Sequence, residues 1–199
     1  MPGLKRLAVV WCALGAVVCS VAMRAQQSAG DGPRYRDGKT LIRPADYREW
    51  MFLSSGLGLS YEPPNAAAAA SPRFGNVFVN PSSYRSFMQT GKWPDGTIFI
   101  LENRSSSGEG SITKGGRFQT ELTGIEAEVK DSRFPDGWAF FNFGPARSLK
   151  DAAEPLAGQS VAECVDCHTK NTAVERTFVQ FYPTLLEVAR TKGTLKPGF

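Results

Sequence analysis

Cys164-Val165-Asp166-Cys167-His168 is the stretch around which the rest of the chain is arranged. The two-residue gap places both thiols on one side of a helical turn. A C-x-x-C-H run of this kind attaches a c-type haem through two thioether bonds, and its histidine binds the iron. His168 is the only histidine in the 199 residues, and the other two cysteines lie near the N-terminus, at Cys12 and Cys19. We therefore predict one haem c, covalently bound through Cys164 and Cys167, with His168 as the metal ligand.

The two cysteines also fit a structural disulfide, half of a zinc site or a thioredoxin-like redox pair. A zinc site would lack a fourth ligand, and a redox pair does not need the histidine. Haem attachment is the favoured interpretation because it uses all three residues of the motif.

Residues 1–25 have the pattern of a secretory signal peptide. Lys5 and Arg6 precede the apolar run 7–23, and Ala25 is a candidate cleavage point. The run is slightly short of the roughly 20 residues that a membrane span needs, and an uncleaved inner-membrane anchor is the alternative. We expect a periplasmic bacterial protein, since c-type haem is normally attached outside the inner membrane.

The charge balance excludes one class of partner. The leader holds Lys5, Arg6 and Arg24 and no acidic residue, so its removal lowers the net charge from +4 to about +1. A near-neutral domain lacks the basic footprint of nucleic-acid binding, and we expect no nucleic-acid partner.

The remaining chain divides into a mobile N-terminal arm (26–43), a haem domain (44–192) and a C-terminal tail (193–199). The arm is assigned because it is polar and has no apolar period. In the haem domain, alternating or continuous apolar runs predict strands over 74–79, 97–101, 121–130 and 138–143. A further strand is predicted to begin at Met51.

Helices are predicted from their start and stop signals. Pro44 suits the first turn of a short helix over 45–50, and Asn80-Pro81 with Gly91 bounds a second one. Ser160-x-x-Glu163 and Thr172-x-x-Glu175 have the capping-box pattern, which predicts a helix carrying the haem motif and another kinked at Pro183. The fold class is α+β: a mainly antiparallel sheet with flanking helices and a helical C-terminal part carrying the haem.

A single histidine limits how the iron is coordinated. Methionine is the other common axial ligand of electron-transfer haems, and outside the leader only Met51 and Met88 are available. Both lie on apolar segments where core packing is the favoured role. We expect a five-coordinate iron with one open face that binds a small ligand, and a plain electron-transfer cytochrome remains an alternative.

Short segments spread over residues 44–190 resemble the cytochrome P-460 family, in the order and position that the family shows. They are Tyr47-Arg48-Glu49-Trp50, Val77-Phe78-Val79-Asn80-Pro81, Thr90-Gly91, Asp95-Gly96-Thr97, Gly124-Ile125-Glu126-Ala127, Val129-Lys130-Asp131, Trp138-Ala139-Phe140 and Phe181-Tyr182-Pro183. The resemblance implies an antiparallel sheet with helices, haem c on a proximal histidine, and often a homodimer. It also implies one of two activities: hydroxylamine oxidation to nitrous or nitric oxide, with a lysine cross-linked to the haem, or nitric oxide and carbon monoxide binding in the cytochrome c′-beta branch, which lacks the cross-link.

Two positions discriminate between these activities. The family's cross-linking lysine falls on Leu101 here, and leucine cannot form an amine bond to the porphyrin; Lys92 and Lys114 lie outside this strand. The c′-beta branch often caps its apolar pocket with phenylalanine. Phe99 shares the strand face of Leu101 and is the first candidate for that cap, with Phe74 and Phe78 as looser ones.

Glu126 argues the other way, since it matches a family position where a carboxylate moves protons during hydroxylamine oxidation. A carboxylate in an apolar haem pocket should have a raised pKa and suit general acid or base work. The alternative is a solvated strand glutamate, like Glu128 beside it. The favoured function is binding of nitric oxide or a related ligand with Phe99, Leu101 and Glu126 at the site, and electrons supplied by a soluble partner. Hydroxylamine oxidation stays open as the enzymatic alternative.

Overall fold

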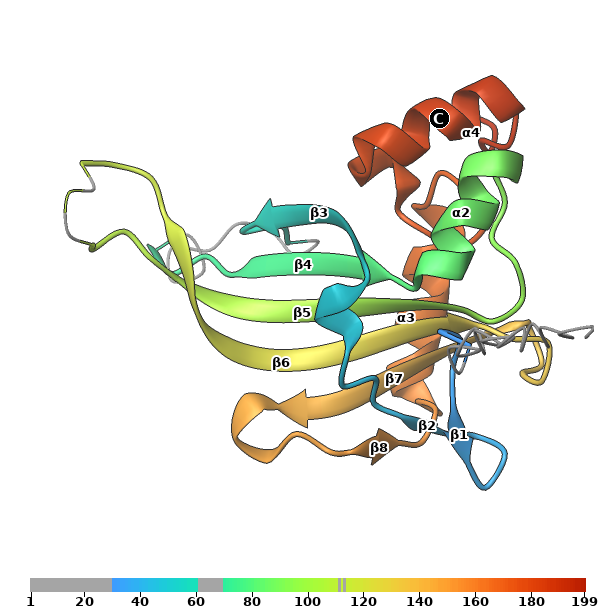
Figure 1. Cartoon of the computed structure of the whole chain (residues 1–199), viewed down its shortest axis with the longest axis horizontal. Coiled ribbons are helices and arrows are strands. Elements are labelled where there is room, and N and C mark those ends of the chain that lie inside the picture. Colours follow the sequence, from blue (N-terminus) through green and yellow to red (C-terminus); the bar gives the residue numbers. More distant parts are fainter. Residues whose placement is uncertain (1–29, 61–69, 111, 113) are drawn as a thin grey trace, which may run out of the picture. The chain divides into compact units, whose positions relative to one another are not determined.

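The computed structural model describes residues 30–60, 70–110, 112 and 114–199. Asp31–Phe199 form one compact unit, and the description concerns that unit alone. Its centre is a five-stranded antiparallel sheet with strand order β3-β4-β5-β6-β7, shown in Figure 1. The strands are β3 (Met51–Leu57), β4 (Phe74–Val79), β5 (Thr97–Ser107), β6 (Phe118–Lys130) and β7 (Trp138–Pro145).

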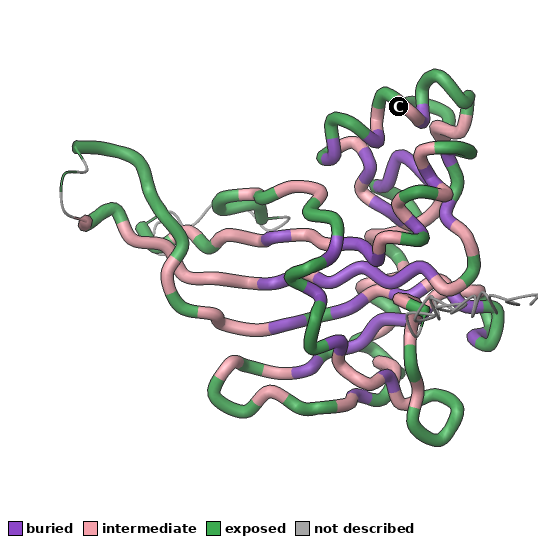
Figure 2. The backbone as a smooth tube through the Cα atoms, viewed as in Figure 1, coloured by how far each residue is buried: buried purple, intermediate pink, exposed green. Residues whose placement is uncertain are grey.

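Every predicted strand is present, and the combination of antiparallel sheets with helices confirms the α+β class. β4 has the predicted bounds, whereas β5 and β6 extend toward their shared loop beyond the predicted 97–101 and 121–130. The added residues are mostly polar. They belong to the strands because their backbones pair between β5 and β6, not because they bury apolar side chains. In β5 and β6 burial is concentrated in the halves remote from their shared loop, and the ends near that loop are more exposed (Figure 2).

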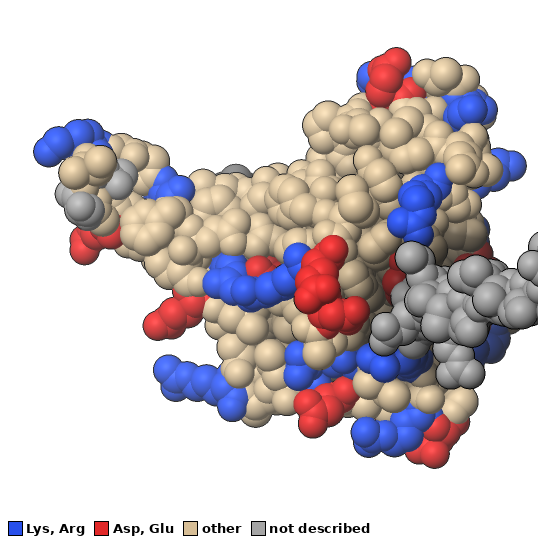
Figure 3. Space-filling view, in the orientation of Figure 1, with Lys and Arg blue, Asp and Glu red and all other residues tan. Residues whose placement is uncertain are grey.

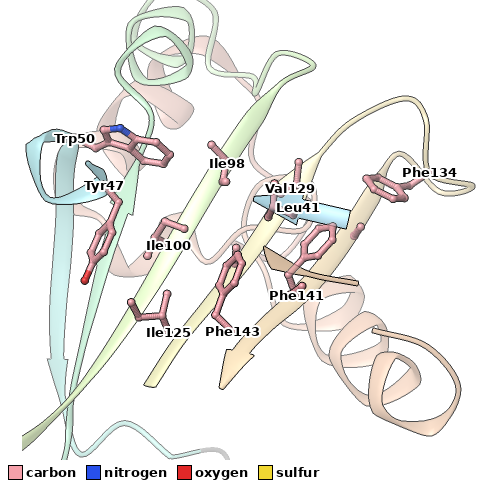
Figure 4. Close-up of a cluster of buried hydrophobic side chains, with 13 residues drawn as sticks. Leu41, Tyr47, Trp50, Ile98, Ile100, Ile125, Val129, Phe134, Phe141 and Phe143 are labelled. Atoms are coloured by element: carbon pink, nitrogen blue, oxygen red, sulfur yellow. The ribbon is translucent and has the colours of Figure 1, made fainter. Parts of the chain in front are cut away.

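One face of the sheet is covered by a small sheet and a 3-10 turn. Alternation sends Ile98, Ile100, Ile125 and Val129 to this face, where each is at most 1% exposed. They pack with aromatic side chains of β7 and of the covering segments (Figure 4). The covering segments are η1 (Tyr47–Glu49) and the sheet β1-β2-β8, with β1 (Tyr35–Arg36), β2 (Thr40–Ile42) and β8 (Ala152–Ala153).

This small sheet corrects the prediction of a mobile arm over 26–43, as far as those residues are described. Leu41 in β2 is fully buried and pairs with Ala153, more than a hundred residues later. The few apolar residues of this segment show no period in the sequence, yet Leu41 and Tyr35 pack in the core cluster and hold the segment there. Nearby, the predicted helix over 45–50 is shorter than expected and is the 3-10 turn η1.

The opposite face carries the helices α2 (Pro81–Thr90) and α4 (Pro183–Lys192). α2 has the predicted start and stop: Gly91 adopts φ 70° and its N–H bonds to the Phe87 carbonyl. A Cβ on Gly91 would lie 2.8 Å from Lys192 Cβ, so glycine allows the ends of α2 and α4 to approach closely. No helix in the described part of the chain is long and apolar enough to span a membrane.

The predicted helix carrying the haem motif is present as α3 (Gln159–Lys170), but it begins after Gly158, so Ser160 lies inside it and does not cap it. The helix predicted to start at Thr172 is absent. Residues 171–178 form a loop with the 3-10 turn η3 (Val179–Phe181) after it, and Pro183 begins α4 rather than kinking a longer helix. The predicted 193–199 tail is not free, since Lys196 N bonds to the Ala173 carbonyl and Lys196 Nζ to Thr172 Oγ1. The predicted leader lies outside the described residues.

A buried carboxylate ties η1 to the central sheet. Glu102 on β5 is 3% exposed, accepts hydrogen bonds from the Tyr47 hydroxyl and Asn76 Nδ2, and pairs with Arg104 Nε at 2.6 Å and Arg48 Nη2 at 2.7 Å. Burial alone would raise the pKa of Glu102, but these donors outweigh burial and lower it.

The lowered pKa predicts acid sensitivity that Glu102→Gln removes. The stabilisation from ionised Glu102 is complete above the ordinary glutamate pKa of about 4.3 and is lost as pH falls through the lower folded-state pKa. We expect Glu102→Gln to lower the free energy of unfolding by about 1–3 kcal/mol at pH 7 and to flatten its acid limb. Urea denaturation between pH 7 and pH 3 measures both effects, and a variant with the wild-type curve would contradict them.

Candidate functional site

Helix α3 presents the three motif residues together. Cys164, Cys167 and His168 stand at i, i+3 and i+4, so they share one face of the helix. Asp166 lies off this face, where it pairs with Lys170 at 2.6 Å with both side chains exposed. The Cys164 thiol lies 3.3 Å from the Ser160 carbonyl, and both cysteines are half-buried free thiols.

All six predicted site residues line one cavity of about 590 Å³. Cys164, Cys167 and His168 border it from α3, and Phe99, Leu101 and Glu126 border it from β5 and β6. Further lining side chains come from β3, β4, β7 and the segment around η3, and they are Ser54, Val77, Phe140, Phe178, Phe181 and Tyr182 among others. The cavity therefore lies between the helical face of the sheet and the helix that carries the motif.

The two discriminating positions are direct cross-strand neighbours. Leu101 on β5 pairs with Glu126 on β6 and with Val77 on β4, and all three line the cavity. Gly75 makes room for the leucine, since a Cβ there would lie 3.3 Å from Leu101 Cδ1. The wall opposite α3 thus has an apolar part beside the carboxyl groups of Glu126 and Glu128.

Glu126 has no hydrogen-bond or ion-pair partner among the described residues, although solvent still reaches it through the cavity. Burial by the surrounding protein raises the pKa of its carboxyl. Its predicted place and its predicted pKa shift therefore agree with the geometry. Arg73, which the sequence did not single out, is a cation bordering the same cavity.

The imidazole ring of His168 is held by a hydrogen bond at Nδ1 and by contacts with two phenylalanine rings. Its Nδ1 lies 2.8 Å from the Arg176 carbonyl, which can only accept, so Nδ1 carries the proton and Nε2 keeps its lone pair for a metal. Phe140 and Phe178 meet the ring edge-on, with centroids at 4.8 Å and 4.7 Å. The imidazole orientation is consequently fixed before any cofactor binds.

Glu128 is a site residue that sequence reasoning missed. It was taken as solvated, but its side chain is 11% exposed and its Oε1 lies 3.2 Å from His168 Nδ1. Burial raises the pKa of Glu128 while His168 opposes that rise. For His168, burial alone would lower the pKa, but Glu128 and the Arg176 carbonyl outweigh it and raise the pKa overall. The available signal was strand parity, because Glu128 must face the same way as Glu126.

Several weaker candidates do not border the cavity. Met51 lies on the edge strand β3 and is 37% exposed, and Met88 lies on α2, partly buried against the apolar cluster on the helical face. Phe78 packs edge-on against Tyr47 and Phe52, on the other side of the sheet, and Phe74 shares its parity. Among the described residues no methionine or lysine lines the cavity.

The thiols do not have the character of a redox pair. Burial raises the pKa of the Cys164 thiol, and the nearby carboxyls of Glu126 and Glu128 raise it further. Reactive redox cysteines depend on the opposite shift, toward a stable thiolate. Within the described residues, no three His, Cys, Asp or Glu side chains cluster to hold a metal ion.

The residues present fit a haem. Two thiols and an imidazole with a free Nε2 converge on one large cavity whose other walls are mainly apolar, and haem c needs these groups and this shelter. The fold and the site thus define an α+β haem-binding cytochrome. The family model of cytochrome P-460 matches residues 44–179, and the chain belongs to that family. No curated protein sequence gives a significant match.

Figure 3 shows the face of the unit that carries η1, which is not the face that borders the cavity. Basic and acidic side chains are interspersed on this face, and neither sign dominates a large patch there.

The raised pKa of Glu126 predicts a pH-dependent pocket. Its carboxyl is neutral at low pH and ionises as pH rises through a folded-state value above the ordinary 4.3 or so, which adds a charge to the cavity. We expect ligand affinity of the haem protein to change across that window and Glu126→Gln to abolish the change. Glu121→Gln, an exposed carboxyl on the same strand, is the matched control. An unaltered pH profile in Glu126→Gln would contradict the assignment.

Phe99 and Phe78 provide a paired test of the cavity wall. Each truncation to alanine should cost about 3–5 kcal/mol of stability, because each phenylalanine packs in an apolar cluster. Only Phe99→Ala should accelerate carbon monoxide binding to the ferrous protein, since Phe78 faces away from the cavity. Flash photolysis measures the rates, and equal rates in the two variants would contradict the placement of Phe99.

Proposed function

We propose that this protein is an exported monohaem c-type cytochrome that binds nitric oxide or a related small ligand at a haem with one open axial position. Cys164 and Cys167 would hold the haem by thioether bonds, and His168 Nε2 would bind the iron. The observation that carries the proposal is the single cavity shared by the motif on α3 and by Phe99, Leu101 and Glu126.

Coordination supports an open position. His168 is the only histidine of the chain, and neither Met51 nor Met88 borders the cavity. A haem held there supplies an iron that binds diatomic ligands and passes single electrons. The apolar wall formed by Val77, Phe99 and Leu101 favours small neutral ligands, because charged ones would lose their hydration without a partner.

Hydroxylamine oxidation is the second candidate, and Glu126 is the observation in its favour. An unpartnered carboxyl with a raised pKa holds its proton more readily than an ordinary glutamate, which suits it to general acid or base work. Leu101 at the position of the family's cross-linking lysine opposes it. The proposal therefore places the chain with the ligand-binding branch rather than with the lysine-linked oxidases.

The remaining expectations are proposals on the same footing. Export to the periplasm follows from the leader pattern, a soluble electron-transfer partner from the haem itself, and a homodimer from the family resemblance. An inner-membrane anchor remains the alternative to full release.

Mass spectrometry of the haem peptide tests which branch the protein follows. Digestion of the mature holoprotein should yield one peptide that carries haem through Cys164 and Cys167 alone, with the mass of two thioether links. A third attachment to any side chain would contradict the proposal. Hydroxylamine turnover is assayed separately on the same preparation, and steady production of nitrous oxide would replace ligand binding by the second candidate.

A further inference from the structure

The carboxylate of Glu128 is buried at the back of the His168 ring and is left incompletely satisfied. Glu128 stands on β6, where its ladder partners are Phe99 on β5 and Phe140 on β7. Its Oε1 is fully buried and makes no hydrogen bond among the described residues, although it lies 3.2 Å from His168 Nδ1. A buried oxygen without a hydrogen bond costs stability, so its retention calls for a compensating role.

Among the described residues, no cation other than His168 forms an ion pair with Glu128. Arg176 and Glu175 are the other charged groups that act on its carboxyl, and they act in opposite directions. Arg176 directs Nη2 toward Asp136 at 3.6 Å, while its buried Nη1 has no hydrogen bond among the described residues. Phe99 and Phe140 supply no polar contact. The imidazole Nδ1, 3.2 Å from Glu128 Oε1, is a group able to donate to this carboxylate.

A tight loop holds the competing acceptor in place. Glu175 has φ 50°, an unusual value for a residue other than glycine, and its side chain is tied to Lys130 Nζ at 2.6 Å. Thr172 Oγ1 bonds to the His168 carbonyl, and Trp93 Nε1 bonds to Thr177 Oγ1 at 2.8 Å. These contacts fix the Arg176 carbonyl 2.8 Å from Nδ1, on the side of the ring remote from the metal-binding nitrogen.

We infer that Glu128 is a positioning residue that acts on the haem through His168, sharing the Nδ1 proton with the Arg176 carbonyl. A carboxylate acceptor draws on an imidazole N–H more strongly than a neutral carbonyl does, so Nε2 becomes a stronger donor. The inference rests on the proposed binding of haem by His168. It does not depend on which ligand occupies the open face.

Two consequences distinguish this role from a structural one. A stronger Nε2 donor tightens the iron–histidine bond, and added negative charge beside the ligand favours the ferric state over the ferrous state. The wild-type ferrous protein should therefore have an iron–histidine stretching band above that of a haem whose histidine donates to a backbone carbonyl alone. Resonance Raman spectroscopy of the wild-type holoprotein measures this band directly.

Glu128→Gln removes the charge while keeping the size of the side chain. We expect its iron–histidine stretching frequency to fall and its ferric–ferrous equilibrium to move about tenfold toward the ferrous form, which is about 59 mV for a one-electron couple. Glu128→Asp keeps the negative charge but places the carboxylate farther from His168 Nδ1, because aspartate is one methylene shorter. It should give intermediate shifts in both quantities. Glu163→Gln is the matched control, because Glu163 borders the same cavity without contacting His168.

The outcomes separate this inference from the proposed function. Shifts in Glu128→Gln that exceed those of Glu163→Gln support it, even if nitric oxide proves not to be the ligand. Loss of haem from Glu128→Gln with retention by Glu128→Asp also supports it. A wild-type stretching band at the value of a carbonyl-bonded histidine, or a Glu128→Gln variant no different from the control, would overturn it. Absence of an axial histidine would instead overturn the proposed function.

Discussion

The hydrogen bond from His168 Nδ1 to the Arg176 carbonyl is the contact on which the account of this site depends. It fixes the tautomer, so Nε2 is the nitrogen left for iron, and it orients the ring between Phe140 and Phe178. The contact exists because the loop after α3 turns back sharply, through Glu175 with its positive φ, and is anchored by Trp93 at Thr177 and by Lys130 at Glu175. The strained loop thereby orients the His168 imidazole.

One face of the central sheet lines the cavity, and its other face packs in the core. Odd-numbered positions of β5 and even-numbered positions of β6 face the cavity, while their neighbours Ile98, Ile100 and Ile125 fill the core on the other side. Leu101 and Glu126 meet as cross-strand partners on the cavity face. Leu101, which argues against a cross-linked haem, and Glu126, which argues for proton transfer, therefore border the same cavity.

Much of this arrangement could be predicted from the sequence because its signals are local. The C-x-x-C-H spacing, the alternation in β4 to β7 and the Pro81–Gly91 bounds of α2 each depend on a few neighbouring residues. Long-range packing was beyond reach. Nothing local says that Leu41 would bury itself against β8, or that Thr172 would bond to the His168 carbonyl instead of starting a helix. Glu128 was within reach by parity, but its burial depends on the return of residues 171–178 to the sheet.

We propose that a single ligand from the chain, His168, holds the iron and leaves its other axial position open. Optical and electron paramagnetic resonance spectra of the purified ferric protein, followed by the ferrous protein with and without nitric oxide, report this coordination. An open axial position predicts a high-spin ferric signal and a ferrous spectrum that changes on addition of nitric oxide. A low-spin, six-coordinate spectrum that nitric oxide leaves unchanged would contradict it.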